Sequence, residues 1–96
     1  MRVRLTPNAR TDLREIHDWI ARDDPDAAVR FAAELRRKAG EVGELPFGFP
    51  ACGGRRAELR KRSWRDYIIV YRVTREVEIV GFFHARRDYL KLLDDI

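Results

Sequence analysis

The hydrophobic residues of this chain are densest in two runs toward its C-terminal end, at residues 67–73 and 77–83. Both runs are rich in β-branched and aromatic side chains, which fit the pleated surface of a sheet. A short polar break separates them, so the pattern predicts two strands joined by a turn. In the first strand, Ile69 and Tyr71 point to one face and Val70 points to the other, so both faces are apolar. Such a strand is usually interior to its sheet, with cover on each face.

Two stretches upstream carry apolar residues at the spacing of an amphipathic α-helix. Thr6 and Pro7 supply the N-cap and the first position of one helix, and Asp24 and Pro25 repeat this signal for a second. Asp12 is expected on the solvent side of the first helix. Because the link between the helices is very short, they are expected to form an antiparallel hairpin. Their apolar stripes are Ala9, Leu13, Ile16, Trp19 and Ile20, and then Ala28, Phe31, Leu35, Ala39 and Val42.

The remaining segments complete an α+β pattern. Residues 2–5 alternate polar and apolar side chains, which predicts a short strand at a sheet edge. Residues 45–54 form a loop rich in glycine and proline, and residues 56–62 predict a further strand. The end of the chain predicts a short helix or a tail with Tyr89, Leu92, Leu93 and Ile96 at helical spacing. The order β-α-α-β-β-β indicates one domain, residues 1–96, with a helical hairpin packed on a small antiparallel sheet.

Length and cysteine content indicate the number of domains and the cellular compartment. Ninety-six residues suit one small domain, and the single Cys52 cannot form an internal disulfide. The chain therefore suits a reducing, cytoplasmic compartment, and Cys52 is expected to be exposed in its loop. The sequence has no apolar run long enough to cross a bilayer, so no membrane segment is expected. No His, Cys, Asp or Glu pair has the spacing of metal ligands, so neither a metal nor a cofactor is expected.

Charge gives a local signal. The chain carries 20 basic and 16 acidic residues, but residues 55–65 contain six basic residues against one acid, Glu58. A cluster of this kind suits an acidic protein or a phosphate backbone, although charged side chains also keep an edge strand soluble. Two further arginines join the cluster if the strands pair as predicted. The predicted target-binding patch is Arg55, Arg56, Arg60, Lys61, Arg62, Arg65, Arg86 and Arg87.

The ordered set of motifs resembles the ParE/RelE superfamily of toxins from type II toxin–antitoxin systems. The resemblance covers nearly the whole chain and is carried by four pieces rather than by one signature. They are Ala9 with Asp12-Leu13 and Ile20-Ala21, then Asp24-Pro25-Asp26-Ala27-Ala28 with Arg30-Phe31, then Tyr67-Ile68-Ile69-Val70-Tyr71-Arg72-Val73, then Val77-Glu78-Ile79 with His84-Ala85-Arg86-Arg87-Asp88.

The superfamily has two branches, and the resemblance favours the ParE-like one. RelE-like members cleave mRNA on the ribosome and place an arginine where this chain has Ile68 and a tyrosine where it has Leu92. Arg86 and Lys61 do match basic residues of that branch. Other RNA-cleaving members use a C-terminal His-Tyr pair, but here the histidine and the tyrosine are not adjacent. If the chain were an RNase, its catalytic candidates would be Lys61, His84, Arg86 and Tyr89.

The ParE-like branch implies a toxin that poisons DNA gyrase by binding it, with no catalytic residues of its own. It also implies a cognate antitoxin that binds the toxin directly, in a heterocomplex such as a heterotetramer, and that alone contacts operator DNA. The predicted antitoxin-binding residues are Ile16, Trp19, Ile20, Phe31 and Leu35. An inactive member that serves only as a binding or repressor module stays an alternative.

Three groups of residues also have structural interpretations. His84 can fix the end of its strand through Asp88 or a backbone carbonyl rather than act as an acid. Tyr67 and Tyr71 lie at alternate positions of an apolar strand, where core packing is commoner than base stacking. The basic pair after the last strand can contact a target, or can pair with the acidic tail. The residues concerned are Arg86, Arg87, Asp94 and Asp95.

Overall fold

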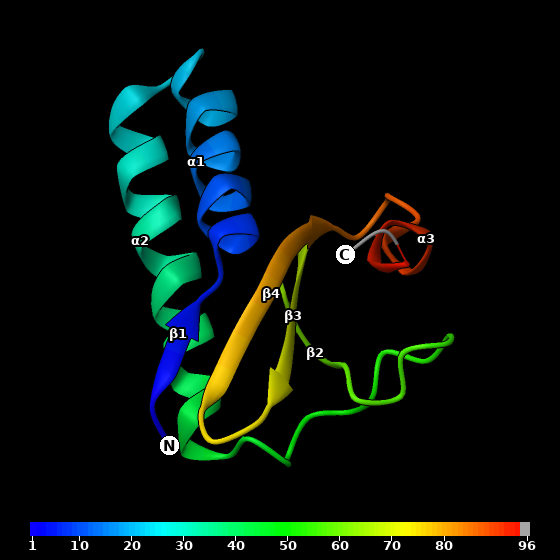
Figure 1. Cartoon of the computed structure of the whole chain (residues 1–96). Helices are drawn as coiled ribbons and strands as arrows, with labels where there is room; N and C mark the ends of the chain where they lie inside the picture. Colours follow the sequence, from blue (N-terminus) through cyan, green and yellow to red (C-terminus); the bar gives the residue numbers. More distant parts are fainter. Residues whose placement is uncertain (95–96) are drawn as a thin grey trace.

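The first half of the chain is the predicted helical hairpin. The computed structural model describes residues 1–94. A short strand, β1 (Val3–Leu5), leads directly into α1 (Pro7–Ala21). The chain then reverses into α2 (Pro25–Glu41), which ends in a 3-10 turn, η1 (Val42–Glu44). Figure 1 shows the two helices side by side, with their connection at the far end from the N-terminus.

Three strands and a short helix make up the second half. The strands are β2 (Arg60–Trp64), β3 (Tyr67–Val73) and β4 (Val77–His84). They are followed by α3 (Tyr89–Leu93), and Ile96 of the predicted terminal helix lies outside the described residues. The α+β class is confirmed, with the hairpin on one side of the sheet and α3 on the other (Figure 1).

Both predicted helix N-caps are confirmed. The hydroxyl oxygen of Thr6 accepts a hydrogen bond from the Ala9 backbone N–H at 3.2 Å, and the Asp24 carboxylate accepts one from the Ala27 N–H at 3.0 Å. A side-chain cap of this kind usually stabilises its helix by about 1 kcal/mol. The Thr6 hydroxyl also donates to the Ile79 carbonyl at 2.8 Å. The same residue therefore begins α1 and fixes it to β4.

The sheet has the strand order β1-β4-β3-β2, and it is mixed rather than wholly antiparallel. β2, β3 and β4 pair antiparallel as predicted, whereas β1 pairs with β4 in parallel, with Val3 opposite Val77 and Leu5 opposite Ile79. The cause is the direction of the chain. The hairpin returns the chain to the end where it began, and three alternating strands then leave β4 running in the same direction as β1.

The main core lies between the hairpin and one face of the sheet. Ile69 and Tyr71 of β3 point toward the helices and have no exposed surface, and Leu35 of α2 is equally buried. The Tyr71 hydroxyl donates to the Pro46 carbonyl at 2.7 Å, which satisfies the one polar atom of that side chain. The core interpretation of Tyr71 is confirmed, and Tyr67 packs against the same core while half-buried.

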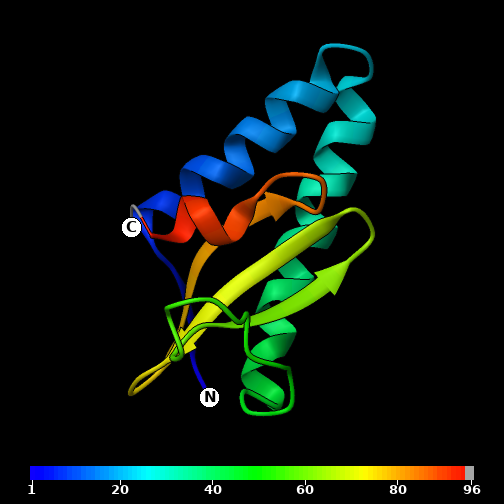
Figure 2. The same cartoon turned by 90° about the vertical axis from the view of Figure 1, so that its right-hand side faces the viewer.

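A second, smaller core covers the opposite face of the sheet, so both faces of β3 are apolar and covered, as predicted. Figure 2 shows α3 and the long loop in front of the strands on this side. Leu93 of α3 and Leu59 of the loop pack with Val70 of β3. Cys52 belongs to this core and is only 6% exposed, so the prediction of an exposed cysteine is wrong. Burial raises the pKa of the Cys52 thiol.

The strand predicted at residues 56–62 begins later, at Arg60. Residues 56–59 instead turn back over the sheet, which places Leu59 in the second core with 1% of its surface exposed. The Cys52 N–H donates to the Leu59 carbonyl at 2.9 Å and closes this turn. None of the helices among residues 1–94 has the length and apolar character needed to span a membrane.

Candidate functional site

The basic residues predicted as a target-binding patch are divided between the two faces of the sheet and the loops beside it. Arg60 and Arg62 of β2 extend toward the helices. Arg62 donates to the Lys38 carbonyl at 2.8 Å and to the Glu41 carboxylate at 3.0 Å, and Arg60 donates to the Phe49 carbonyl at 2.7 Å. The hydrogen bond from Arg62 holds the pKa of Glu41 below its ordinary value. These two arginines therefore fix β2 to α2 and to the loop.

Lys61 lies between them in sequence but on the opposite face, opposite Val70 of the second core. Its ammonium group donates to the Tyr89 hydroxyl at 3.2 Å and lies 5.8 Å from the centre of the tyrosine ring. Lys61 therefore contacts α3, whereas Arg60 and Arg62 contact α2 and the loop.

The remaining patch residues lie in turns. Arg56 pairs with Glu58 at 2.6 Å and donates to the Leu93 carbonyl at 3.4 Å. Arg65 has a left-handed backbone, with φ of 51°, and its guanidinium stacks on Trp64 at 5.1 Å. The exposed members are Arg55, Arg65, Arg86 and Arg87.

Three of the four candidates for RNA cleavage separate into two groups, and the fourth, Arg86, is exposed in the turn after β4. Lys61 and Tyr89 meet on the face of the second core. His84 lies on the helix-covered face, with its ring 5.3 Å from that of Tyr67. The His84 Nδ1 accepts a hydrogen bond from the backbone N–H of Arg86 at 3.1 Å. His84 thus fixes the end of its strand as predicted, but through a backbone N–H rather than through Asp88 or a carbonyl.

One of the two interpretations of Arg86 and Arg87, pairing with the acidic tail, finds no support among residues 1–94. Arg86 and Arg87 are exposed and form no ion pair with Asp94 in that part of the chain. Asp95, the other predicted partner, lies outside the described residues.

The predicted antitoxin-binding residues differ in what they can offer to a partner. Leu35 is fully buried and Ile16 is 8% exposed, so these two stabilise the hairpin and present almost no surface. They were predicted as contact residues because a helical stripe alone does not reveal which members the sheet covers. Ile20 and Phe31 are half-buried, and Trp19 is 67% exposed, which also corrects its predicted place in the packed stripe.

A cleft of about 270 Å³ lies where α1 crosses the end of β4. It brings together one residue from each of three predicted sets: Trp19 of the antitoxin-binding residues, His84 of the RNA-cleavage candidates and Arg87 of the target-binding patch. Tyr67 lines it as well. Its walls carry both signs of charge and several aromatic rings, so it suits a protein side chain better than an anion.

Asp12 lies beside this cleft and binds a backbone group at the edge of β4. The prediction that it lies on the solvent side of α1 is therefore wrong. Its carboxylate accepts a hydrogen bond from the Phe82 N–H of β4 at 3.0 Å. Burial raises the pKa of Asp12, an effect that the Phe82 hydrogen bond and the nearby Arg87 partly oppose. Gly81 permits this approach, since a Cβ there would lie 2.8 Å from the Asp12 carboxylate oxygen.

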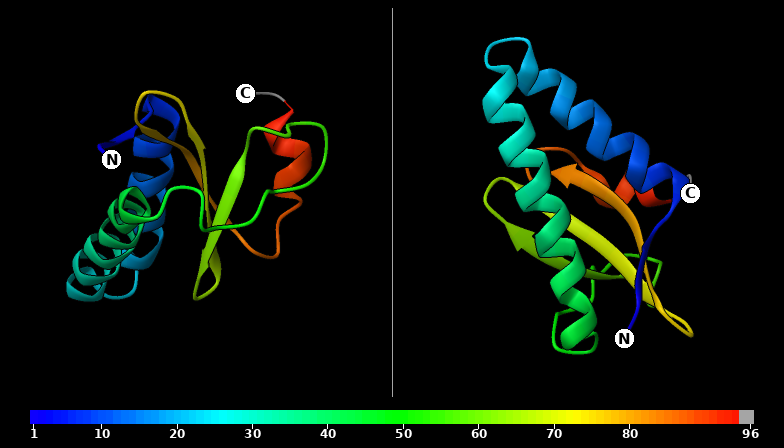
Figure 3. Two further views of the ribbon diagram at one scale, coloured as in Figure 1. Left: turned by 90° about the horizontal axis from the view of Figure 1, so that it is seen from below. Right: turned by 90° about the vertical axis from the view of Figure 1, so that its left-hand side faces the viewer.

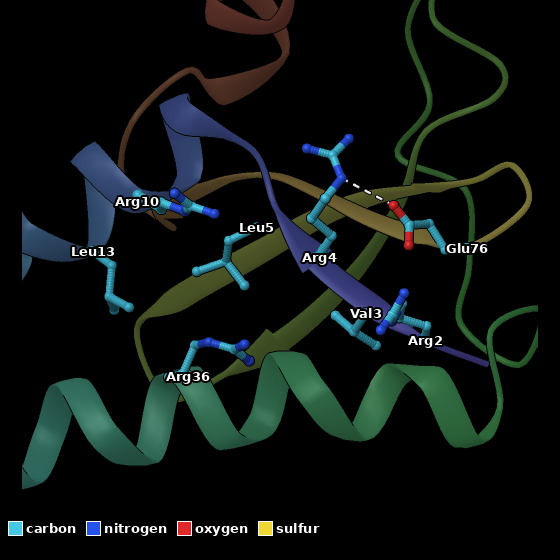
Figure 4. A pocket seen from close by; sticks show the side chains of 8 residues that line it. All are labelled: Arg2, Val3, Arg4, Leu5, Arg10, Leu13, Arg36 and Glu76. Carbon is cyan, nitrogen blue, oxygen red and sulfur yellow. Dashed lines mark hydrogen bonds and ion pairs between the residues drawn. The ribbon is translucent and has the colours of Figure 1, made fainter.

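A larger cleft, of about 710 Å³, lies beside β1 and was not predicted (Figure 4). We call it the β1 cleft. Four arginines and one acid line it together with three apolar side chains, and the residues are Arg2, Val3, Arg4, Leu5, Arg10, Leu13, Arg36 and Glu76. Arg4 pairs with Glu76 at 2.9 Å and also with Glu78. Arg2, Arg10 and Arg36 are exposed and have no hydrogen bond or ion pair among the described residues.

The β1 cleft escaped sequence reasoning because its arginines are far apart in the chain. They come from β1, α1 and α2, and only the folded hairpin brings them together. The alternation of arginine with apolar residues at positions 2–5 was the one available signal, and it predicted an edge strand rather than a site.

Comparisons with known proteins support the sequence resemblance. A curated protein of Sinorhizobium fredii, named "Putative toxin Y4kP", is 38% identical over 96 residues, covering 96% of each chain. A solved structure titled "Chromosomal ParDE TA system from P. aeruginosa" contains a chain with a TM-score of 0.78 at 16% identity, covering 90% of this chain and 97% of that one. At that identity the structural match shows the fold.

The family model described as "ParE toxin of type II toxin-antitoxin system, parDE" matches residues 3–89. That span runs from β1 to the first residue of α3 and includes both helices and all four strands. This chain therefore belongs to the ParE family of toxins of type II toxin–antitoxin systems.

Proposed function

We propose that this toxin acts in the cytoplasm by binding and poisoning DNA gyrase, and that direct binding of a cognate antitoxin neutralises it. Membership of the ParE family, across residues 3–89, supports the proposal. The toxin and antitoxin would form a heterocomplex such as a heterotetramer, and the antitoxin alone would contact operator DNA.

We favour a binding mechanism over a catalytic one because the RNA-cleavage candidates lie on different faces of the sheet. A general acid and a general base must lie within hydrogen-bond reach of the same substrate atoms. Here His84 lies against Tyr67 on the helix-covered face, while Lys61 and Tyr89 lie on the opposite face. Ile68, at the position of the RelE-like arginine, is 8% exposed in the second core and carries no charge to stabilise a phosphorane.

The target surface would consist of the exposed basic residues. Arg86 and Arg87 follow β4 and Arg55 lies in a turn, and all three are exposed and can reach a partner. Arg65 is also exposed, with its guanidinium stacked on Trp64. Arg60 and Arg62 hold β2 in place, and we therefore assign them to the fold and not to the target surface.

A supercoiling assay with purified gyrase tests the proposal. The toxin should block supercoiling or cause cleaved DNA to accumulate, and added antitoxin should reverse the effect. The double variant Arg86→Glu/Arg87→Glu should weaken inhibition, with Arg14→Glu as a matched control from the exposed side of α1. Gyrase that stays fully active at a large excess of folded toxin would contradict the proposal.

RNA cleavage is the second candidate, and one contact favours it. The Lys61 ammonium and the Tyr89 hydroxyl lie 3.2 Å apart, which is close enough for the cation to assist proton transfer at the phenol. If this pair were catalytic, ribosome-dependent mRNA cleavage would be present in the wild type and lost in Tyr89→Phe. We expect no cleavage by either protein.

A further inference from the structure

The cleft between α1 and the end of β4, which we call the α1–β4 cleft, is rich in aromatic rings. Figure 3 (right) shows the hairpin over the sheet, with α1 beside the C-terminal end of β4. The lining of the cleft includes the rings of Trp19, Tyr67, Phe82 and His84. Its volume of about 270 Å³ is enough for one long side chain of a partner.

Neighbouring side chains hold two of these rings in place. Arg22 stacks on the Trp19 ring at 5.2 Å but does not itself line the cleft. The Tyr67 ring packs edge-on against Phe31 at 5.6 Å and against His84 at 5.3 Å. Trp19 is nevertheless 67% exposed, so its ring is accessible to a partner. Because the faces of aromatic rings attract cations, and those of tryptophan most strongly, the rings form a preorganised site for a positive charge.

Two carboxylates at the same cleft favour a cation as well. Glu15 is exposed and has no hydrogen bond or ion pair among residues 1–94. Burial raises the pKa of the Asp12 carboxyl and repulsion from Glu15 raises it further, while the Phe82 hydrogen bond and the charge of Arg87 oppose this. A cation placed between the two carboxylates would relieve their repulsion.

Arg87 shows that a guanidinium group can lie at this cleft without neutralising it. Its side chain lines the cleft and is exposed, and it forms no ion pair within the described part of the chain. Its attraction to Asp12 does not overcome the effect of burial on that carboxyl. Arg87 can therefore turn outward when a second cation enters.

We propose that the α1–β4 cleft binds the ammonium or guanidinium group of a lysine or arginine of the target protein, gyrase. The inference rests on the proposed function, because it assumes this target. The cation would lie against the Trp19 ring and pair with Asp12 and Glu15. Arg86 and Arg87 would pair with acidic residues beside it. The matching surface of the target is thus a basic side chain flanked by acids.

The chemistry of the cleft excludes other occupants. A nucleic-acid base could stack on the rings, but its phosphates would approach the carboxylates of Asp12 and Glu15. An apolar side chain would contact the rings but would remove the carboxylates from water without giving them a partner. A cation satisfies the rings and the carboxylates at once.

The affinity of toxin variants for purified gyrase tests the inference. Glu15→Gln removes one carboxylate of the cleft and should weaken binding by about fivefold or more. Asp18→Asn removes the same charge from an exposed position of α1 outside the cleft, and is the matched control. If only the general attraction between a basic toxin and an acidic target mattered, both variants would bind more tightly than the wild type.

Equal affinities for Glu15→Gln and Asp18→Asn would overturn the inference and leave the proposed function standing. A folded wild type that does not bind gyrase would contradict both. Antitoxin binding that weakens in Glu15→Gln, while gyrase binding does not, would also overturn the inference, because it would assign the cleft to the antitoxin.

The aromatic ring can be tested separately from the charges. Trp19→Phe keeps an aromatic face at the cleft, whereas Trp19→Leu keeps only apolar bulk, and the exposure of Trp19 means that both variants should fold. We expect the leucine variant to bind gyrase about threefold more weakly than the phenylalanine variant. Equal binding by the two folded variants would overturn the contact between the ring and a cation.

Discussion

The two edges of the sheet use arginine in different ways. At the β2 edge, Arg60 and Arg62 donate to carbonyls of the loop and of α2, and the Lys61 N–H donates to the Pro50 carbonyl at 2.9 Å, so the surrounding chain closes the edge. At the β1 edge, three arginines lack partners among residues 1–94 and the outward backbone groups are unpaired. A dense run of basic residues can therefore be structural, while a dispersed set forms the open cationic surface.

The largest expected effect on stability distinguishes a β1 residue whose backbone N–H points toward β4 from one whose N–H points away. Arg4 turns its backbone toward β4 and also pairs with Glu76, so Arg4→Pro should lower the free energy of unfolding by about 3 kcal/mol or more. Val3→Pro removes an N–H that points away from the sheet, a position that proline tolerates on edge strands. Its cost should be smaller than that of Arg4→Pro and close to that of Val3→Ala, because either variant loses the packing of Val3 against the main core. Urea denaturation measures both.

Equal losses for Arg4→Pro and Val3→Pro would contradict the assignment of the outward edge. The wild type and Arg4→Ala are the controls, since the alanine variant removes the ion pairs of Arg4 but retains its N–H. The difference between Arg4→Pro and Arg4→Ala then reports the loss of the strand N–H together with the backbone restriction that proline imposes.

A second effect should appear at the β2 edge. Arg62→Met keeps much of the apolar stem but removes the hydrogen bonds to the Lys38 carbonyl and the Glu41 carboxylate, and should lower the free energy of unfolding by about 1.5 kcal/mol. Arg14→Met, at an exposed position of α1, is the control and should change stability little. If Arg62→Met were as stable as the control, the β2 arginine would be free for a target after all.

Much of the fold could be predicted from the sequence because local signals specify it. The proline and N-cap pairs begin both helices, and the alternation of Ile69 and Val70 places apolar residues on both faces of β3. The parallel pairing of β1 also follows from chain direction once the hairpin is known. The late start of β2 and the burial of Cys52 do not follow, because they depend on how one loop folds over the second core.

The site was harder to predict because exposure and pairing are tertiary properties. Residues 55–65 show the density of charge but not that Arg60 and Arg62 are engaged inside the fold. The helical stripe likewise does not distinguish the buried Leu35 from the exposed Trp19. The β1 cleft depends on side chains from three elements, which no local pattern connects.

The third expected effect is a pH dependence of stability caused by Asp12, whose carboxylate binds the backbone at the edge of β4. Burial raises the pKa of Asp12 in the folded state above its unfolded value, so the ionised carboxylate opposes folding. Stability linked to this group is therefore greatest below the unfolded pKa and is lost as pH rises through the raised pKa. Asp12→Asn keeps an oxygen that can accept from the Phe82 N–H, and it should be more stable than the wild type at neutral pH.

The advantage of Asp12→Asn should disappear as the pH falls below the pKa of the carboxyl group in the unfolded chain. Thermal unfolding of both proteins between acidic and neutral pH measures this. Asp12→Ala, which leaves the Phe82 N–H without its acceptor, is the companion variant and should be less stable than Asp12→Asn at every pH. An advantage of the asparagine variant that does not vary with pH would contradict the role of ionisation.

The smallest effect on stability is expected at the β1 cleft, and there a null result is informative. Arg10→Gln and Arg36→Gln remove charges that have no partner among the described residues, so each should change the free energy of unfolding by less than about 0.5 kcal/mol. A clear loss of stability in the free toxin would mean that these arginines act as Arg62 does, within the fold, and the contrast between the two edges would disappear.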